Sequence, residues 1–326
     1  MDRHSILEYL GSEWSRTEEL ISSSLSSDIK LLDDTNRSIL EYSGKKLRPM
    51  MSLLMAKACS NSALPEDSIR FAAAAELLHN ATLLHDDVAD RSETRRGVPT
   101  VASLLGDTPS VLVGDFWLVK AVEAVLSAEH HGDDVTKLFS RTLCDLAEGE
   151  MLQLQKAASG DTSEDDYFRI IYSKTASLFV AGCVAAAISV DAPDEMKTAA
   201  REYAVSLGLA YQVKDDIMDY EGGNIGKPTG VDLKEQKITL PLLGALQSAD
   251  EQTDRRIRAM VCGIPDHPGN VDAVVDFVKS RDGIAYAEKK LSELCSKAAE
   301  ALSVLPDSPA KEYLIELARY TGERKK

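Results

Sequence analysis

Two groups of aspartates with the same spacing are the residues of this chain best suited to bind a metal ion. Each forms a D-D-x-x-D motif: the first is Asp86, Asp87 and Asp90, and the second is Asp215, Asp216 and Asp219. Aspartates four positions apart share one face of a helix, so each motif gathers carboxylates on one side. Gathered carboxylates repel one another and are costly to bury without a counterion. Because all the ligand atoms are oxygens, the motifs predict Mg²⁺ sites, and two facing motifs would hold a diphosphate through the metal ions.

Paired aspartates alone indicate little in a chain this acidic. The pairs Asp33–Asp34, Asp133–Asp134 and Asp165–Asp166 also occur, and we expect all three at helix starts or on solvated surface. The two D-D-x-x-D motifs differ because each ends an apolar helical stretch and is followed by basic residues. An acidic helix end at the surface remains the alternative for either motif taken alone, but it explains the two together poorly.

Basic residues lie in three places from which they could reach phosphate oxygens. They are Lys45, Lys46 and Arg48 in the segment GKKLRP, then Arg91, Arg95 and Arg96 after the first motif, and Lys227, Lys234 and Lys237 after the second. Fixed cations can take the phosphate oxygens that a metal ion leaves open, and arginine can do so with two hydrogen bonds. Solvated surface is the alternative for each cluster, and it is strongest for Lys46 and Lys234.

The segments that carry these residues have the hydrophobic periodicity of helices. We expect long helices over residues 68–90, 110–127, 134–157, 164–189, 194–220 and 273–302. No convincing run of two-residue alternation bounded by hairpin turns predicts strands. Breaks rich in Pro and Gly separate the helices, and no linker divides the chain. The sequence therefore predicts an all-α bundle of about ten or more helices, forming a single domain over residues 1–326.

Composition narrows the class of protein further. The chain has 37 Lys and Arg against 53 Asp and Glu, a formal net charge of −16, which argues against a nucleic-acid partner. The longest apolar run, Leu178–Val190, is shorter than a membrane-spanning helix requires, so we expect a buried core helix and no membrane anchor. The first residues lack the continuous apolar stretch that is typical of a signal peptide, and the five cysteines form no C-x-x-C pair. These features predict a cytoplasmic protein with reduced thiols.

Taken together, the motifs resemble those of the trans-isoprenyl diphosphate synthases, or polyprenyl synthetases. In chain order they are GKKLRP (44–49), ELLHNATLLHDDVADRSETRRGVPT (76–100), YSKTASLF (172–179), YQVKDDIMD (211–219) and GKPTGVDLKEQK (226–237). The resemblance implies an all-helical bundle around a deep central cavity, usually a homodimer. It also implies a prenyltransferase that joins isopentenyl diphosphate to allylic diphosphates with Mg²⁺, using three ions per active site.

The resemblance implies a role for each motif residue. The diphosphate of isopentenyl diphosphate would be held by Lys45, Arg48, His79 and Arg96. Mg²⁺ would be bound by Asp86, Asp90 and Asp215, supported directly or through water by Asp87, Asp216 and Asp219. The allylic diphosphate would be surrounded by Arg95, Lys174, Thr175, Gln212, Lys227 and Lys237. The residues assigned to catalysis are Asp86, Asp90, Lys174, Asp215 and Lys227. From spacing alone, His79 could be a core residue and Lys174 an ordinary part of a helix.

The reaction that the resemblance implies is electrophilic. Departure of pyrophosphate leaves cation character at the allylic C1, the double bond of isopentenyl diphosphate attacks it, and the released pyrophosphate takes the proton. The nearest rival is a class I terpene cyclase, whose second metal motif usually mixes Asn, Ser or Thr, and Glu, whereas here it is all aspartate. Two further rivals are a non-catalytic subunit of a heteromeric synthase, which tends to lack the aspartate motifs, and a structural acidic protein.

Product length is predicted from the residues before the first aspartate. Leu78 and Thr82 lie two turns and one turn below Asp86, and each turn descends roughly 5.4 Å, comparable to one extended isoprene unit. Short-chain members of the family often block the tunnel with an aromatic residue four or five positions before this aspartate. Those positions are Thr82 and Ala81 here, so we expect a product of about C30 to C50, such as an octaprenyl chain for quinones. A residue from another helix that plugs the tunnel would instead give farnesyl or geranylgeranyl diphosphate.

The homodimer that the resemblance implies would need an apolar helical face. The candidate lies within 110–127, where five apolar residues cluster around Asp115: Val111, Val113, Phe116, Trp117 and Val119. Packing of the same residues into the core is the alternative.

Overall fold

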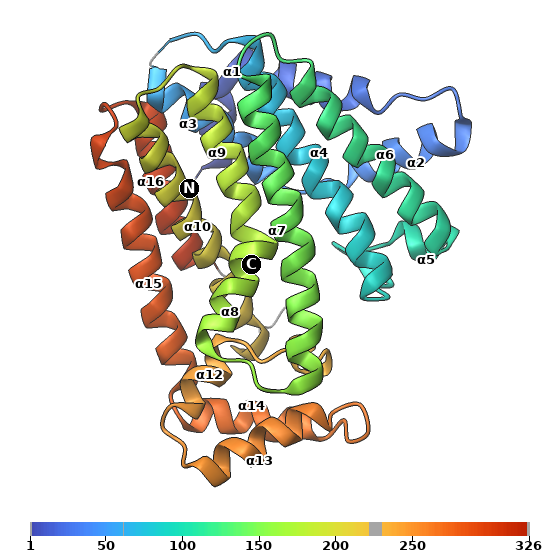
Figure 1. The fold of residues 1–326 in the computed structure, drawn as a ribbon, viewed down its shortest axis with the longest axis vertical. Coiled ribbons are helices and arrows are strands. Elements are labelled where there is room, and N and C mark those ends of the chain that lie inside the picture. Colours follow the sequence, from blue (N-terminus) through green and yellow to red (C-terminus); the bar gives the residue numbers. More distant parts are fainter. Residues whose placement is uncertain (1, 61, 222–229, 325–326) are drawn as a thin grey trace. The chain divides into compact units, whose positions relative to one another are not determined.

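The computed structural model describes residues 2–60, 62–221 and 230–324, and this part of the chain is all-α apart from one small hairpin (Figure 1). The α-helices are α1 (Arg3–Ser24), α2 (Lys30–Glu41), α3 (Leu47–Ser60), α4 (Glu66–Ala89), α5 (Val101–Leu105), α6 (Asp107–Leu126), α7 (Gly132–Ser159), α8 (Glu164–Ile171), α9 (Ser177–Ser189), α10 (Asp194–Glu221), α11 (Val231–Lys234), α12 (Leu240–Leu246), α13 (Glu251–Cys262), α14 (Asn270–Ser280), α15 (Gly283–Ala301) and α16 (Pro309–Glu323). The hairpin pairs β1 (Thr94–Arg95) with β2 (Val98–Pro99). The predicted fold class is confirmed.

The chain forms two compact units, each assembled from three separate stretches. Unit 1 consists of Met1–Ser140, Leu178–Arg201 and Val304–Leu314, and unit 2 of Arg141–Ser177, Glu202–Ser303 and Ile315–Lys326. The organisation of residues 1–326 as a single domain stays a prediction.

Unit 1 is built around α4, which α1, α3 and α6 contact. Four successive alanines of α4, residues 72–75, are fully buried, and small side chains let neighbouring helices approach closely. The helix α6 packs against α4, and the Ser110 hydroxyl of α6 donates to the carbonyl of Leu84 in α4 at 3.0 Å. Trp117 of α6 is fully buried and donates from Nε1 to Asn36 of α2 at 2.8 Å. The first aspartate motif is thus carried by the central helix of this unit.

Two of the five residues predicted to form a dimer face on α6 are buried, so this part of the prediction is wrong. Val113 is 5% exposed and Trp117 is fully buried, so both belong to the core of unit 1. Val111 and Val119 are exposed, as a contact face requires. The exposed apolar residues of α6 also include some that the sequence analysis did not select: Leu112, Val122 and Leu126.

Unit 2 has a core to which α8, α10 and the helices from α12 to α15 contribute. On α10, the residues Ala210, Val213, Ile217 and Tyr220 are fully buried, and their spacing of three and four places them on one face of the helix. That face holds α10, and with it the second aspartate motif, against the core. The motif therefore stands at the end of a helix that apolar packing positions.

The single helix predicted over residues 273–302 is two helices in the structure, α14 and α15. Asp282 has a left-handed φ of 54°, and α15 begins at Gly283. A Cβ atom on Gly283 would lie 2.1 Å from the carbonyl oxygen of Pro241 in α12. The helix is interrupted at Asp282, and the missing Cβ of Gly283 lets the start of α15 lie close to α12, an approach that the periodicity of 273–302 could not reveal.

The other long helices were predicted within a few residues, including the segment from 164 to 189. That segment contains one π-helical turn, Tyr172–Ala176, between α8 and α9. It is also long and apolar enough to cross a membrane, but 83% of its most apolar window is buried inside the structure, as in a core helix. The three Asp-Asp pairs were expected at helix starts or on solvated surface, and a member of each pair lies in a first turn: Asp33 in α2, Asp133 in α7 and Asp166 in α8.

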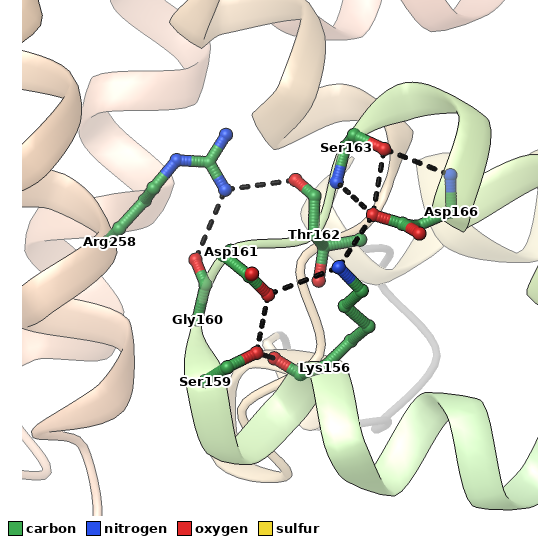
Figure 2. A network of polar contacts seen from close by, with 8 residues as sticks. All are labelled: Lys156, Ser159, Gly160, Asp161, Thr162, Ser163, Asp166 and Arg258. Carbon is green, nitrogen blue, oxygen red and sulfur yellow. Dashed lines mark hydrogen bonds and ion pairs between the residues drawn. The ribbon is translucent and has the colours of Figure 1, made fainter.

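The connection between α7 and α8 is held by a network of polar contacts (Figure 2). Ser163 and Asp166 cap each other at the start of α8, and Lys156 of α7 lies 2.9 Å from the Asp166 carboxylate. Arg258 donates to the backbone carbonyls of Gly160 and Thr162 at 3.1 and 2.9 Å. The hydrogen bond from Lys156 is the main cause that lowers the pKa of Asp166 to about 2. The first turn of α8 is therefore fixed from α7 and from α13.

Candidate active site

The first aspartate motif lies at the C-terminal end of α4, where its carboxylates have different surroundings. Asp86 is half-buried and Asp90, which ends the helix, is exposed, whereas Asp87 is only 4% exposed. Asp87 continues the buried face that Asn80 and Leu84 form, because positions three and four apart share a face of a helix. Asp86 and Asp90 are the carboxylates of this motif that solvent can reach.

Asp87 pairs with Arg95, a residue that the resemblance assigned to the allylic diphosphate. The Arg95 Nε atom donates to Asp87 Oδ1 at 2.8 Å, and Nη2 lies 2.7 Å from the same oxygen. Arg95 belongs to β1, and Thr100 closes the loop by donating to the carbonyl of Ser92 at 2.8 Å. Asp87 therefore ties the hairpin to the end of α4, a contact between two residues that were predicted to serve different ligands.

Three residues predicted to bind isopentenyl diphosphate, Arg48, His79 and Arg96, lie within electrostatic reach of one another. The guanidinium of Arg48 lies over the ring of Phe179, 4.7 Å from its centre. Arg96 has a left-handed φ of 54° and donates from Nη1 to the carbonyl of Tyr42 at 2.9 Å. This arrangement gathers positive charge beside α4, as a site for a diphosphate requires.

A glycine in GKKLRP leaves room for Arg96. Gly44 has a φ of 77°, which L-residues rarely adopt, and a Cβ atom there would lie 2.7 Å from Arg96 Cζ. Lys45 is exposed, whereas Lys46 is paired with Glu18 of α1 at 2.8 Å. The side chain of Lys46 is only 15% exposed, so it is held by this pair and does not lie on solvated surface, the alternative expected for it from the sequence.

Burial and the charges of the basic cluster shift the pKa values of two residues of α4. Burial, together with the positive charges of Arg48, Arg96 and Arg95, holds the pKa of His79 well below its ordinary value. His79 is therefore neutral at pH 7 and can donate one hydrogen bond. Burial raises the pKa of Glu76, and the charge of Arg48 opposes that rise. Sequence reasoning missed Glu76, although its position one turn before His79 was a usable signal.

The second motif, at the C-terminal end of α10, also divides its carboxylates among different partners. Asp216 is 2% exposed because it lies on the buried face between Val213 and Tyr220. Its two oxygens accept hydrogen bonds from Tyr167 at 2.7 Å and from Gln212 at 2.8 Å. Burial raises the pKa of Asp216 well above its ordinary value. This carboxylate is held inside unit 2.

Asp219 and Asp215 are more accessible, and each has a partner far along the chain. Asp219 accepts from the backbone amides of Val231 and Asp232 at 3.0 and 3.2 Å, which fastens the start of α11 to the motif. Asp215 accepts from Arg324, just beyond α16, at 2.8 Å. Sequence reasoning missed Arg324 because no motif or spacing connects it with the aspartates.

Lys174 and Thr175 lie in the π-helical turn of unit 2, and Thr175 joins a further predicted residue. Its hydroxyl donates to the Oε1 atom of Gln212 at 2.9 Å, while Lys174 lies 2.5 Å from Glu150 of α7. A Cβ atom on Gly149 would lie 2.5 Å from Ser173 Cβ, so this glycine allows α7 to approach the π turn. π turns inside helices frequently occur at functional sites.

The remaining two predicted cations lie near the end of the second motif in sequence. Lys237 is half-buried and forms an ion pair with Glu235. Lys227 lies outside the described residues, so its predicted role stays untested. The predicted site residues thus form two groups, one in each unit.

The residues of these groups fit a hard divalent cation. Asp86, Asp90, Asp215 and Asp219 offer only carboxylate oxygens, the donor type that Mg²⁺ and Ca²⁺ prefer. Across residues 2–60, 62–221 and 230–324, no three His, Cys, Asp or Glu side chains form a ready-made cluster. Separate carboxylates suit Mg²⁺ in particular, because it binds one or two of them and completes its shell with water and phosphate oxygens.

The residues predicted to set product length lie on α4 before the motif. Leu78 and Ala81 are each 1% exposed, and half-buried Thr82 donates to the carbonyl of His79 at 2.8 Å. A cavity of about 340 Å³ in unit 1 lies beside a different part of the α4 surface, which includes Leu83 and Asp87. None of the three predicted residues lines this cavity, so their role in chain length stays a prediction.

Comparison with known proteins identifies the class to which this fold and these motifs belong. Residues 29–278 match the family model for polyprenyl synthetase. The chain therefore belongs to the polyprenyl synthetase family and is a prenyltransferase of isoprenoid biosynthesis. Enzymes of this family use a divalent metal ion, which agrees with the oxygen ligands of both motifs. The resemblance predicted from the sequence is confirmed.

Two relatives and one solved structure of this family are similar to the chain over nearly its whole length. The chain is 35% identical over 325 residues to all-trans-nonaprenyl-diphosphate synthase (geranyl-diphosphate specific) of Rhodobacter capsulatus, covering 99% of this chain and 98% of the relative. It is 34% identical over 330 residues to octaprenyl diphosphate synthase of Escherichia coli, covering 99% of each. A polyprenyl synthase from Caulobacter crescentus, complexed with calcium and isoprenyl diphosphate, superposes with a TM-score of 0.90 at 30% identity, covering 100% of this chain and 98% of that one.

Proposed function

We propose that this protein condenses isopentenyl diphosphate with an allylic diphosphate, such as farnesyl diphosphate, to give an all-trans polyprenyl diphosphate of about C30 to C50 for quinone side chains. The observation that carries the proposal is that both aspartate motifs are complete and end α4 and α10 in a chain similar throughout its length to octaprenyl and nonaprenyl synthases. A shorter-chain synthase is the second candidate. It is less favoured because Ala81 and Thr82 carry no aromatic ring.

The proposed binding roles follow the two groups of residues. Lys45, Arg48, His79 and Arg96 hold the diphosphate of isopentenyl diphosphate. Lys174, Thr175, Gln212, Lys237 and Lys227, together with Arg95, hold the allylic diphosphate. Asp86, Asp90 and Asp215 provide carboxylate ligands for Mg²⁺, and we expect three ions per active site. The gathering of Arg48, His79 and Arg96 beside α4, and of Thr175 and Gln212 in unit 2, supports this division.

The proposed chemistry is an electrophilic alkylation. When bound, Mg²⁺ neutralises charge on the diphosphate that leaves. Lys174, Lys227 and Lys237 hold that diphosphate while the bond between C1 and oxygen breaks and C1 acquires cation character. Arg48, His79 and Arg96 orient isopentenyl diphosphate so that its double bond attacks C1, forming the new carbon–carbon bond. The proton lost from isopentenyl diphosphate goes to the released pyrophosphate, and apolar walls keep water from the cation.

We further propose that the protein works as a homodimer through α6. Leu112, Val119 and Leu126 are 62%, 52% and 63% exposed and lie along this helix at spacings of seven residues. Exposed apolar residues aligned on one helix are typical of a contact face. Sedimentation at micromolar concentration tests this proposal: a homodimer should sediment as about 71 kDa, twice the 35.5 kDa chain, and a monomer would contradict it.

Organisation and location are part of the same proposal. We place the whole of residues 1–326 in one catalytic domain, because the match to the family model runs from 29 to 278 and includes stretches of both units. We place the protein in the cytoplasm without a membrane anchor, because the one sufficiently apolar helix among the described residues is largely buried and the five cysteines are free thiols.

The experiment that tests the function is a prenyl transfer assay with radiolabelled isopentenyl diphosphate. Farnesyl diphosphate should be extended to products of about 30 to 50 carbons in a Mg²⁺-dependent reaction. Chromatography of the dephosphorylated products reads the length directly. Products that stop at 15 or 20 carbons would establish the shorter-chain alternative, and hydrocarbon products without consumption of isopentenyl diphosphate would indicate a cyclase.

A further inference from the structure

A chain of hydrogen bonds inside unit 2 connects α8 to the π-helical turn through α10. The Tyr167 hydroxyl donates to Asp216 Oδ2 at 2.7 Å, and Gln212 Nε2 donates to Asp216 Oδ1 at 2.8 Å. The Thr175 hydroxyl then donates to Gln212 Oε1 at 2.9 Å. The first two members, Tyr167 and Asp216, are 3% and 2% exposed, so the chain begins in the core and ends at more accessible residues.

Asp216 is engaged at both oxygens, which separates it from the other carboxylates of its motif. A carboxylate that accepts a hydrogen bond at each oxygen inside the core is held in one orientation. Asp215 and Asp219 are both more exposed than Asp216. Within the second motif, Asp216 is thus the aspartate that faces the protein interior.

The partners of Gln212 determine which way its side-chain amide points. A carboxamide has one acceptor oxygen and two donor hydrogens. In the structure Gln212 Nε2 donates to Asp216 Oδ1, and the Thr175 hydroxyl donates to Gln212 Oε1 at the opposite end of the amide. Reversing the amide would set its oxygen against Asp216 Oδ1, so the contact with Asp216 favours the observed orientation, and the Thr175 hydroxyl, which can donate or accept, fits it. Among the described residues Gln212 donates one of its two N–H groups to Asp216, so the other can serve a ligand, and an anionic diphosphate needs donors.

Tyr167 is held in place independently of α10. It lies in the first turn of α8, where its backbone amide donates to Ser163 at 3.0 Å and its ring packs edge-on against Phe168, 5.2 Å away. The network of Figure 2 fixes that turn through Ser163, Asp166 and Lys156. A rigid support at this point gives the hydroxyl of Tyr167 a defined direction toward Asp216.

We propose that Tyr167 and Asp216 are positioning residues for the allylic diphosphate, acting by fixing Gln212 with an N–H donor available to it. The inference rests on the proposed function, and it gives Asp216 a task other than binding metal. Thr175 contributes by holding the amide oxygen. The residue that touches the substrate in this scheme is Gln212, and Tyr167 acts on it through Asp216.

The test compares Tyr167→Phe with a matched control, Tyr220→Phe. Tyr220 is another fully buried tyrosine of the same core, and among the described residues its hydroxyl makes no hydrogen bond to Asp216. Tyr167→Phe should raise the KM for farnesyl diphosphate about five- to tenfold, the scale of one lost hydrogen bond. It should leave the KM for isopentenyl diphosphate and the half-saturating Mg²⁺ concentration within about twofold of wild type. The control should change none of them.

A double-mutant cycle separates positioning from a general loss of structure. With Gln212→Met in place, adding Tyr167→Phe should cause no further rise in the allylic KM, because the residue that it positions is gone. The dissociation constant for a non-reactive farnesyl thiolodiphosphate, measured by calorimetry, should follow the same pattern. If Tyr167→Phe folds poorly, Asp216→Asn carries the same expectation for the allylic KM.

The outcomes distinguish this inference from the proposed function. An active wild-type enzyme whose Tyr167→Phe variant has unchanged kinetics, or equal rises in both KM values, would overturn the positioning role. Additive effects in the double mutant would overturn it as well, as would a Mg²⁺ requirement that rises with Asp216→Asn. A wild-type protein that does not extend farnesyl diphosphate would instead contradict the proposed function.

Discussion

The Nη2 atom of Arg324 lies 2.8 Å from Asp215 Oδ1. An arginine from beyond α16 therefore forms an ion pair with one oxygen of a carboxylate proposed to bind Mg²⁺. The same nitrogen donates to the carbonyl of Tyr211 at 2.7 Å, and the guanidinium lies 3.9 Å from the centre of the Tyr211 ring. Arg324 is 7% exposed. A fixed positive charge at this carboxylate repels a divalent cation that approaches the same group.

The first prediction concerns that charge. Arg324→Met should lower the half-saturating Mg²⁺ concentration about three- to tenfold, because the repulsion is removed. The same variant should melt at a lower temperature than wild type in EDTA, because Asp215 then lacks its partner. Arg319→Met, at an exposed arginine of α16, is the control and should change neither. A higher Mg²⁺ requirement in Arg324→Met would mean that the arginine orients Asp215 for the metal rather than competing with it.

The second prediction concerns the metal ligands of α4. Asp86→Asn keeps the size of the side chain and removes its charge, so turnover should fall ~10²-fold or more through lost charge stabilisation. Asp134→Asn in the first turn of α7 is a matched control and should retain wild-type turnover. Steady-state rates measured over a Mg²⁺ series decide it. Near-wild-type rates at saturating Mg²⁺ would remove Asp86 from the ligand set.

The third prediction separates the two diphosphate sites. Arg48→Ala should raise the KM for isopentenyl diphosphate about tenfold or more, with a smaller effect on the KM for the allylic substrate, because its guanidinium lies in the basic cluster of unit 1. Arg16→Ala, at an arginine paired with Glu66 on the surface, serves as the comparison. Equal effects on both substrates would indicate that Arg48 has a structural role.

The fourth prediction concerns product length. Ala81→Phe places a ring five residues before Asp86, so the product should be shortened to about 15 or 20 carbons, while the early condensations continue. Leu83→Phe is the comparison, because Leu83, unlike Ala81, lines the cavity of about 340 Å³ in unit 1, together with Asp87, Arg95 and Arg96. Its products should keep the wild-type length. Products of unchanged length from a folded Ala81→Phe variant would show that this part of α4 does not determine product length.

The fifth prediction follows from a buried acid near the second motif. Burial is the main cause that raises the pKa of Asp232 from 3.8 to about 6, and the charge of Asp219 raises it further. Between these values the folded state binds more protons than the unfolded state, so this group lowers the free energy of unfolding as the pH rises from about 4 to 6. In EDTA, Asp232→Asn should remove that loss. Urea unfolding should therefore show the variant gaining stability relative to wild type across this range.

That gain should be largest above pH 6 and vanish below pH 4, where Asp232 is protonated in both states. Asp272→Asn, in the first turn of α14, is an appropriate control and should leave the pH dependence of unfolding unchanged. A stability difference that is the same at every pH would assign the effect to packing rather than to titration.

The sequence by itself determined the features that depend on residues within a turn or two of each other. The spacing of Asp86 and Asp90 places both on the end of one helix, and the Asp165–Asp166 pair, expected at a helix start or on solvated surface, lies in the first turn of α8. The family was also readable, because its motifs are short and contiguous. The burial of Asp87 and Asp216 could have been inferred as well, since each continues the buried face of its helix.

Only the tertiary structure decided which partners these residues have. Arg324 and Asp215 are 109 residues apart, and Tyr167 and Asp216 are 49 apart, so no local pattern connects them. The close approach of Gly283 to the carbonyl of Pro241 likewise brings together residues of two different helices. The physical reason is that periodicity and capping act within one segment, whereas buried hydrogen bonds and close approaches depend on which segments the packed core brings together.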